Sequence, residues 1–237
     1  MEFINTTNSS DLTFLWQNKI WFRGENQKLR AISERQRLYD NKGIVIAKNE
    51  LNSNLQASTV FENPSELYDF IEKTPDNLRC FYEIIEHNSK LYFYIEYQYY
   101  SLNLTDVLQH LYSILKLLYN IYPKKRIILS SHRFNKKTWH IIFPEYSISH
   151  EERKKLSKYL KTFAKPYVDW KVYNKNQPLR LCGCYKSNNF CSKLHLNDEN
   201  ENTVFNYDSN TFISTMVTQQ CHQGDDTINI ESKYSEF

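Results

Sequence analysis

One acidic residue, Glu96, interrupts a strongly apolar and aromatic stretch, Lys90–Tyr97. A buried carboxylate without a partner is costly, so we expect Glu96 to meet a cation, a metal ion or solvent. A second cluster, Asn135–Phe143, is basic at its start and apolar at its end. Alternation along a strand puts every second side chain on one face, which groups Lys136, Thr138 and His140. By itself, the pattern equally fits a histidine of the core.

A third cluster runs from Val168 to Leu181 and ends near Lys186. It contains Asp169, which could be a functional carboxylate or could cap a turn, and Arg180, which could bind an anion or be an ordinary surface charge. Cysteine and histidine ligands suited to zinc follow in the order Cys182-x-Cys184-x₆-Cys191-x₃-His195. This spacing fits no common zinc finger, so we favour unliganded thiols and keep zinc as the alternative.

Charge is distributed unevenly along the chain. Residues 124–186 contain sixteen Lys and Arg against four Asp and Glu, whereas the segment from Leu196 onward has eight acidic residues and one Lys. Such a basic segment is typical of a protein that binds a polyanion, most often nucleic acid. The alternative is a solvated helix face at 153–165, which would explain part of the charge.

The composition excludes several classes of protein. With 4 Gly the chain has neither GxxxxGKS/T nor GxGxxG, which argues against a P-loop ATPase or a Rossmann enzyme. No apolar run approaches the length of a membrane span, and the polar N-terminus lacks the pattern of a signal peptide. We therefore expect an intracellular protein outside the membrane. The nucleus, mitochondrion, cytoplasm and a viral factory are not distinguished.

Periodicity and turn residues predict an α+β fold with a mainly antiparallel sheet and flanking helices. Helices are predicted over Leu12–Trp21, Lys28–Tyr39, Pro64–Glu72, Thr105–Tyr122 and 149–165. Strands are predicted near Gly43–Ala47, at Arg79–Glu86 and Lys90–Tyr97 as a hairpin, at Arg126–Ser131, Trp139–Phe143 and, interrupted by Pro178, Val172–Tyr185. Three parts are expected: an N-terminal helical and mixed segment, 1–55, packed on a core, 56–195, and an acidic, Asn-rich and partly disordered segment, 196–237.

The three clusters, taken in order, resemble the motifs of the archaeo-eukaryotic primase superfamily, which includes primase-polymerases and the primase domain of poxvirus-type primase-helicases. The similarity extends from about Val60 to Lys186. The matching residues are Leu91-Tyr-Phe-Tyr-Ile-Glu96, then Lys136-Lys-Thr-Trp-His140-Ile-Ile-Phe, then Val168-Asp169-Trp-Lys-Val-Tyr173-Asn-Lys-Asn-Gln177-Pro-Leu-Arg180-Leu181, and Lys186.

The resemblance implies a DNA primase or primase-polymerase that transfers nucleotides from NTP or dNTP on a single-stranded DNA template. It implies that Glu96 and Asp169 hold Mg²⁺ or Mn²⁺ and that His140 is catalytic. It also implies that the triphosphate is held by Lys136, Thr138, His140, Arg180 and Lys186. A helicase or another replication subunit is the implied protein partner.

Three positions depart from the family pattern. Tyr94 replaces the first Asp, Gln177 replaces an Arg, and Thr138 replaces a Ser. Tyrosine cannot bridge two metal ions as a carboxylate does, and Gln177 lacks the charge for phosphate pairing. The sequence therefore leaves two alternatives to an active primase: a non-catalytic primase-fold subunit that binds nucleic acid or nucleotide, and a metal-dependent nuclease built on Glu83, Glu96 and Asp169. On the predicted hairpin, Glu83 could also replace the missing carboxylate.

Overall fold

The computed structural model of the chain describes residues 2–4, 12–49, 56–97, 103–133, 136–163, 168–186, 189–198, 202–218 and 228–231. The fold is α+β with mostly antiparallel strand pairs, as the sequence predicts. In the described parts of the chain, no helix is both long enough and apolar enough to span a membrane. Two compact units divide the chain. Unit 1 comprises Met1–Ile84, Pro178–Leu194 and Asp208–Ile213, and unit 2 comprises Ile85–Gln177, His195–Tyr207 and Ser214–Phe237.

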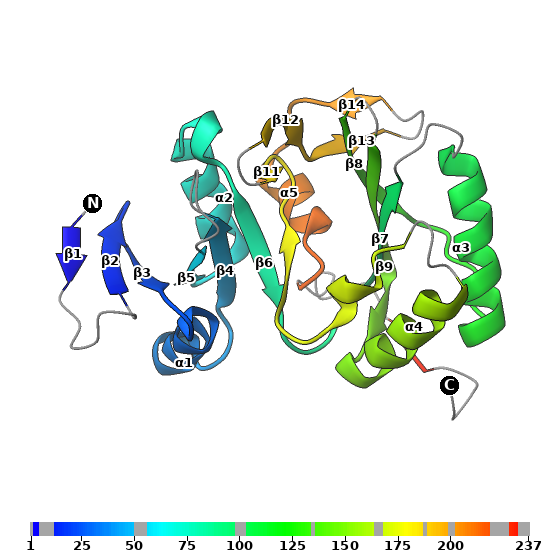
Figure 1. The fold of residues 1–237 in the computed structure, drawn as a ribbon, viewed down its shortest axis with the longest axis horizontal. Coiled ribbons are helices and arrows are strands. Elements are labelled where there is room, and N and C mark those ends of the chain that lie inside the picture. The colour runs from blue at the N-terminus through cyan, green and yellow to red at the C-terminus, as the bar shows by residue number, and fades with distance from the viewer. Residues whose placement is uncertain are drawn as a thin grey trace. The chain divides into compact units, whose positions relative to one another are not determined.

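Unit 1 is built on a seven-stranded sheet with the order β1-β2-β3-β5-β4-β6-β10 (Figure 1). Its strands are β1 (Glu2–Ile4), β2 (Leu12–Trp16), β3 (Lys19–Arg23), β4 (Ile44–Asn49), β5 (Gln56–Phe61), β6 (Phe81–Ile85) and β10 (Gln177–Arg180), with a separate hairpin of β11 (Tyr185–Lys186) and β12 (Asn189–Lys193). Its helices are α1 (Gln27–Tyr39), α2 (Pro64–Lys73) and the 3-10 helix η1 (Asp76–Leu78). The elements β6, β10 and α5 (Ser209–Thr215) continue across the boundary between the units.

The two long helices of unit 1 pack on opposite faces of its sheet. Ala31 of α1 lies in a buried cluster with Val60 and Tyr82. Phe70 of α2 makes edge contacts with Phe61 and Phe81, at ring-centroid distances of 5.0 and 5.7 Å. Because neighbouring residues of a strand point to opposite faces, these contacts place α1 and α2 on different sides.

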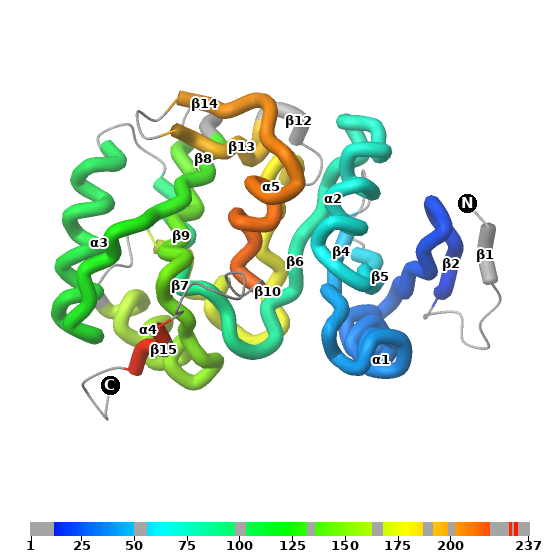
Figure 2. The backbone as a smooth tube through the Cα atoms, turned by 180° about the vertical axis from the view of Figure 1, so that it is seen from behind, coloured from blue at the N-terminus to red at the C-terminus, as the bar shows by residue number. Residues whose placement is uncertain are grey.

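Unit 2 is built on a second sheet, in which β7 and β8 flank β9 and the path continues as β14-β13-β8-β9-β15 (Figure 2). Its strands are β7 (Ser89–Tyr97), β8 (Ile127–Arg133), β9 (Lys136–Ile148), β13 (His195–Asn197), β14 (Thr203–Val204) and β15 (Ile228–Ile230), the last parallel to β9. Its helices are α3 (Leu104–Tyr119), α4 (His150–Phe163) and the 3-10 helix η2 (Trp170–Tyr173).

Different helices contact the two faces of the unit 2 sheet. On one face, Tyr112 of α3 lies 5.9 Å from Phe143 of β9 between ring centroids. On the other face, Tyr173 of η2 stacks on Tyr92 of β7 at 5.3 Å. The hydroxyl of Ser157 on α4 donates to the carbonyl of Trp170, at 3.0 Å, and so joins α4 to η2.

Local signals at helix ends are confirmed where the sequence carries a capping residue. The Asn63 side chain accepts a hydrogen bond from the Glu66 amide at the start of α2, followed by Pro64 in the first turn. Ser149 accepts from the Glu152 amide at 3.2 Å, as the predicted capping box requires. The helices predicted over Lys28–Tyr39 and Thr105–Tyr122 correspond to α1 and α3.

Two predictions of local structure are wrong. The segment Leu12–Trp21, predicted as a helix, forms the antiparallel pair β2 and β3. Gln17 and Asn18 between these strands have positive φ angles of 49° and 60°, the backbone that tight hairpin turns require. The predicted hairpin of Arg79–Glu86 and Lys90–Tyr97 is also wrong, because β6 pairs with β4 whereas β7 pairs with β9.

The remaining predictions concern the extended segment 172–185 and the boundaries of the three expected parts. Val172–Tyr185, predicted as extended, begins with the end of η2 and contains β10 and a turn at 182–183. In the acidic C-terminal segment, β13, β14, α5 and β15 are ordered elements. The predicted core, 56–195, contributes to both units, and the boundary predicted after residue 55 falls between β4 and β5, which pair with each other.

Candidate functional site

The register of β7 on β9 brings two of the three sequence clusters together. Tyr94 lies opposite His140, and Glu96 lies opposite Thr138. Residues that face each other across an antiparallel pair share one side of the sheet, and Lys136, two residues before Thr138, belongs to the same side. The grouping of Lys136, Thr138 and His140 on one face is thus confirmed, with Glu96 beside them.

Asp169 joins this face from the third cluster. An isolated antiparallel bridge links Ile95 to Val168, and the Asp169 amide donates to the Tyr94 carbonyl at 3.1 Å. Asp169 therefore lies across from Tyr94 and diagonally from Glu96, on the same side of the sheet. The fold brings together carboxylates that are distant in the sequence.

The segment that carries Asp169 is fixed from both ends. The Asp169 side chain caps η2, because its Oδ1 accepts a hydrogen bond from the Lys171 amide at 3.0 Å. Two tyrosines hold the other end: the Tyr173 hydroxyl donates to the Tyr92 carbonyl at 3.2 Å, and the Tyr92 hydroxyl donates to the Val172 carbonyl at 3.0 Å. The turn-capping role considered for Asp169 is therefore present, and its second oxygen atom is not used in that cap.

Glu96 meets both a cation and solvent. Its Oε1 forms an ion pair with Lys136 Nζ, and its Oε2 accepts a hydrogen bond from the Tyr94 hydroxyl at 3.0 Å. The side chains of Lys136 and Glu96 are 22% and 26% exposed. The negative charge of the Glu96 carboxylate is therefore already stabilised by Lys136 and by the Tyr94 hydroxyl.

His140 is buried, with 1% of its surface exposed, and its ring centroid lies 4.7 Å from that of Tyr94. Thr138 and Tyr94 are also buried. This packing corresponds to the core alternative for His140. The Tyr94 ring is one of the groups that pack against the buried imidazole.

The remaining predicted site residues belong to unit 1. Arg180 is buried, and its guanidinium donates to the Ser192 carbonyl. Lys186 is exposed on β11. Their convergence with Glu96 and Asp169 of unit 2 stays a prediction. The hairpin register on which Glu83 depended is absent, because β6 pairs with β4, where Glu83 lies across from Ile46, and β7 pairs with β9. Glu83 belongs to unit 1, so its part in the site and in the nuclease alternative stays a prediction.

Metal ligands do not form a large cluster. Across the described ranges, no three His, Cys, Asp or Glu side chains lie close enough together to hold a metal ion. Cys182 and Cys184 are buried in unit 1, and burial raises the pKa of the Cys184 thiol to about 12. The Cys191 side chain lies outside the described ones, so zinc at this cluster stays untested.

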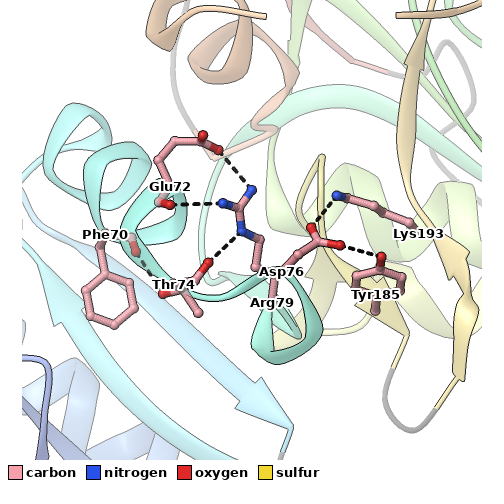
Figure 3. Close-up of polar contacts among 7 residues, drawn as sticks. All are labelled: Phe70, Glu72, Thr74, Asp76, Arg79, Tyr185 and Lys193. Atoms are coloured by element: carbon pink, nitrogen blue, oxygen red, sulfur yellow. Dashed lines mark hydrogen bonds and ion pairs between the residues drawn. The ribbon is translucent and has the colours of Figure 1, made fainter. Parts of the chain in front are cut away.

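Sequence reasoning missed a polar network in unit 1. Asp76 of η1 accepts hydrogen bonds from the Tyr185 hydroxyl, at 2.7 Å, and from Lys193 Nζ. The Arg79 side chain pairs with Glu72 at 3.0 Å and donates to the Thr74 carbonyl (Figure 3). No local spacing joins these residues, because Asp76 and Lys193 are far apart in the sequence.

A scan against models of protein families and a search of curated proteins each found no match.

Proposed function

We propose that this chain is a nucleotidyltransferase of the primase-polymerase type that acts on a single-stranded DNA template with NTP or dNTP. The observation that carries the proposal is the position of Asp169, across from Tyr94 and diagonal to Glu96 on one side of the sheet. Three segments that resemble the motifs of one enzyme superfamily thereby contribute to one surface. The proposal assigns the core to the archaeo-eukaryotic primase fold.

The ligand set suits one divalent cation better than two. Carboxylate oxygens are the ligands that Mg²⁺ and Mn²⁺ prefer, and Glu96 and Asp169 would hold the ion. A bound ion would neutralise the phosphates and orient the reacting oxygens. The second ion of a two-metal site would lack the carboxylate that position 94 supplies in the family. This disagreement predicts weak activity and a preference for Mn²⁺.

The chain's own residues have separable roles in this proposal. Lys136, beside Glu96, would pair with a triphosphate oxygen once the ion pair with Glu96 opens. Thr138 and His140, on the same face, would donate to the same group after the Tyr94 ring moves. Arg180 and Lys186 of unit 1 would contribute further positive charge. A helicase or another replication subunit would supply the template.

The test is primer extension and de novo priming on a single-stranded template, with Mn²⁺ and with Mg²⁺. The chain should extend primers with Mn²⁺, and Asp169→Asn should abolish extension, whereas Lys154→Ala, an exposed change on α4, should not. Extension that is equal in the Asp169→Asn variant would contradict the proposal. Circular dichroism of both variants shows whether a loss of extension comes from loss of the fold.

A second function is favoured by a specific observation, the contacts of Glu96 with Lys136 and Tyr94. A carboxylate so compensated needs no metal ion, and this fits a non-catalytic primase-fold subunit that binds nucleic acid or nucleotide. Binding of ATP or oligonucleotide without extension under any metal condition would support this alternative over the first.

A further inference from the structure

A basic hollow of about 680 Å³ lies in unit 2, away from the candidate site. Lys124, Lys125 and Arg126 line it together with Asn197 and Asp198 of the β13 end. It begins where β8 begins, whereas the candidate site lies beside the other end of β8, where Ser131 pairs with Thr138.

The backbone of the basic segment is held in place. The Glu145 carboxylate accepts hydrogen bonds from the amides of Lys124 and Lys125, each at 2.8 Å. Arg126 follows immediately, and its Nη1 lies 3.3 Å from the Tyr112 hydroxyl of α3. The three side chains therefore project from a fixed stretch of chain rather than from a free loop.

The charge of the hollow favours an anion. Among the residues that the structure describes, no carboxylate forms an ion pair with Lys124, Lys125 or Arg126. Asp198, the one acidic side chain among the described residues that line the hollow, is engaged in its own hairpin: its two oxygens accept from the Asn202 amide, at 2.8 Å, and from Asn202 Nδ2, at 3.0 Å.

Unit 2 also has two exposed aromatic side chains. Tyr122, two residues before Lys124, is 60% exposed, and Phe205, which follows β14, is 77% exposed. The Phe205 ring contacts His195 of β13 at 5.9 Å between centroids, and β13 pairs with β8. Cations that track a backbone, combined with rings on which bases stack, are the features of surfaces that bind single-stranded nucleic acid.

We propose that this hollow is a second phosphate-binding site, which holds a single nucleic-acid strand at a distance from the candidate site. The identity of the ligand rests on the proposed function, but the residues are ones that the candidate site does not use. The stretch of β8 from Ile127 to Ser131 separates the two sites by about 14 Å, at roughly 3.4 Å per residue. A strand of several nucleotides could contact both, whereas a mononucleotide could occupy only one.

The test compares two triple variants by fluorescence anisotropy. The hollow variant removes the cations of the hollow by the changes Lys124→Ala, Lys125→Ala and Arg126→Ala. The α4 variant removes the same charge from the α4 face by the changes Lys154→Ala, Lys158→Ala and Lys161→Ala. The probes are labelled oligo-dT of about 4 and about 16 nucleotides, with labelled ATP as a third ligand. Circular dichroism and thermal unfolding of each variant show that it is folded.

The hollow variant should weaken binding of the longer oligonucleotide and leave the shorter one and ATP nearly unchanged. Each lost phosphate contact lowers the salt slope of single-strand binding by about 0.7, so the slope should become shallower by about 2. The α4 variant should neither weaken binding of the longer oligonucleotide nor make its salt slope shallower. Equal effects of the two variants would overturn the inference, as would a hollow variant that loses ATP but not the oligonucleotide. The proposed function can fail separately: the unmodified chain would then not extend primers, while the hollow variant would still bind the longer oligonucleotide more weakly than the unmodified chain does.

Discussion

The Asp169 amide donates to the Tyr94 carbonyl at 3.1 Å, next to the bridge between Ile95 and Val168. The side chain at position 94 therefore stands between Asp169 on one side and His140 on the other. With tyrosine there, the hydroxyl binds Glu96 and the ring covers the imidazole. A carboxylate at position 94 would instead complete an acidic group with Asp169 and Glu96.

The Tyr94→Asp variant should bind Mn²⁺ more tightly and should extend primers faster than the unmodified chain. It adds a negative ligand across from Asp169 and removes the ring that covers His140. Mn²⁺ binding by titration calorimetry and primer extension with Mn²⁺ would measure the two effects.

Tyr94→Phe is the matched control, because it removes the hydrogen bond to Glu96 and keeps the ring. It should bring no gain in extension. Robust Mg²⁺-dependent priming by the unmodified chain would show that another acid completes the site. An inactive but folded Tyr94→Asp variant that still binds DNA would favour the non-catalytic alternative, with Gln177→Arg as the next change.

Lys136→Ala should change two ligands in opposite directions. Removing the ammonium frees the Glu96 carboxylate for a metal ion, so Mn²⁺ affinity should rise. Binding of ATP should weaken roughly tenfold, because a charge-assisted hydrogen bond contributes about 1.5–3 kcal/mol. Lys137→Ala is the control, since Lys137 lies on the opposite side of β9, near the Trp139 ring. If Lys136→Ala weakens the binding of both Mn²⁺ and ATP, the change acts through the structure instead.

Ser89→Ala should lower the free energy of unfolding by about 1–3 kcal/mol, which is the cost of leaving a buried polar group unsatisfied. The Ser89 hydroxyl accepts a hydrogen bond at 3.0 Å from Arg153, whose side chain is fully buried. In an Arg153→Met background the same serine change should cost little, because the donor is gone. Urea unfolding of the four proteins of this double-mutant cycle measures the coupling, and equal costs in both backgrounds would refute it.

Asp76 should make stability depend on pH below about 4. Burial raises the pKa of its carboxyl, but the hydrogen bonds from Lys193 and Tyr185 outweigh burial and leave the pKa below its ordinary value (Figure 3). A folded pKa below the unfolded value of about 3.9 gives stability that is present above that pH and is lost as pH falls through the folded pKa. With Asp76→Asn, the free energy of unfolding should fall less steeply as pH is lowered below about 4. Asp69→Asn, an equal change at an exposed residue of α2, should not.

Elements with strong local signals could be predicted from the sequence. The spacing of Leu108, Leu111 and Leu115 predicts one apolar helix face, and all three are buried in α3. Asn63 and Pro64 fix the start of α2 through a cap and a first-turn proline. These signals act within a few residues, so they do not depend on the rest of the fold.

Strand partners could not be predicted in the same way. The segments of β6 and β7 are both apolar and lie close in the sequence, which favours a hairpin, yet each pairs with a strand elsewhere. Periodicity determines which residues form a strand but not which edge that strand joins. Consequently, the shared face of Lys136, Thr138 and His140 followed from alternation, whereas the positions of Tyr94 opposite His140 and of Glu96 opposite Thr138 depend on strand pairing and register.

The discontinuity of unit 1 has a consequence for biosynthesis. The neighbour of β6 in its sheet, β10, begins only at Gln177, after the intervening chain has contributed most of unit 2. During synthesis on a ribosome, the strands of unit 1 before β10 therefore emerge first. The β6 edge of their sheet stays unpaired until β10 has been made. Such late, long-range closure is slow and leaves a template for aggregation. Truncation before residue 177 should yield an insoluble fragment, whereas a circular permutant that joins 178–194 directly to the N-terminal strands should fold faster.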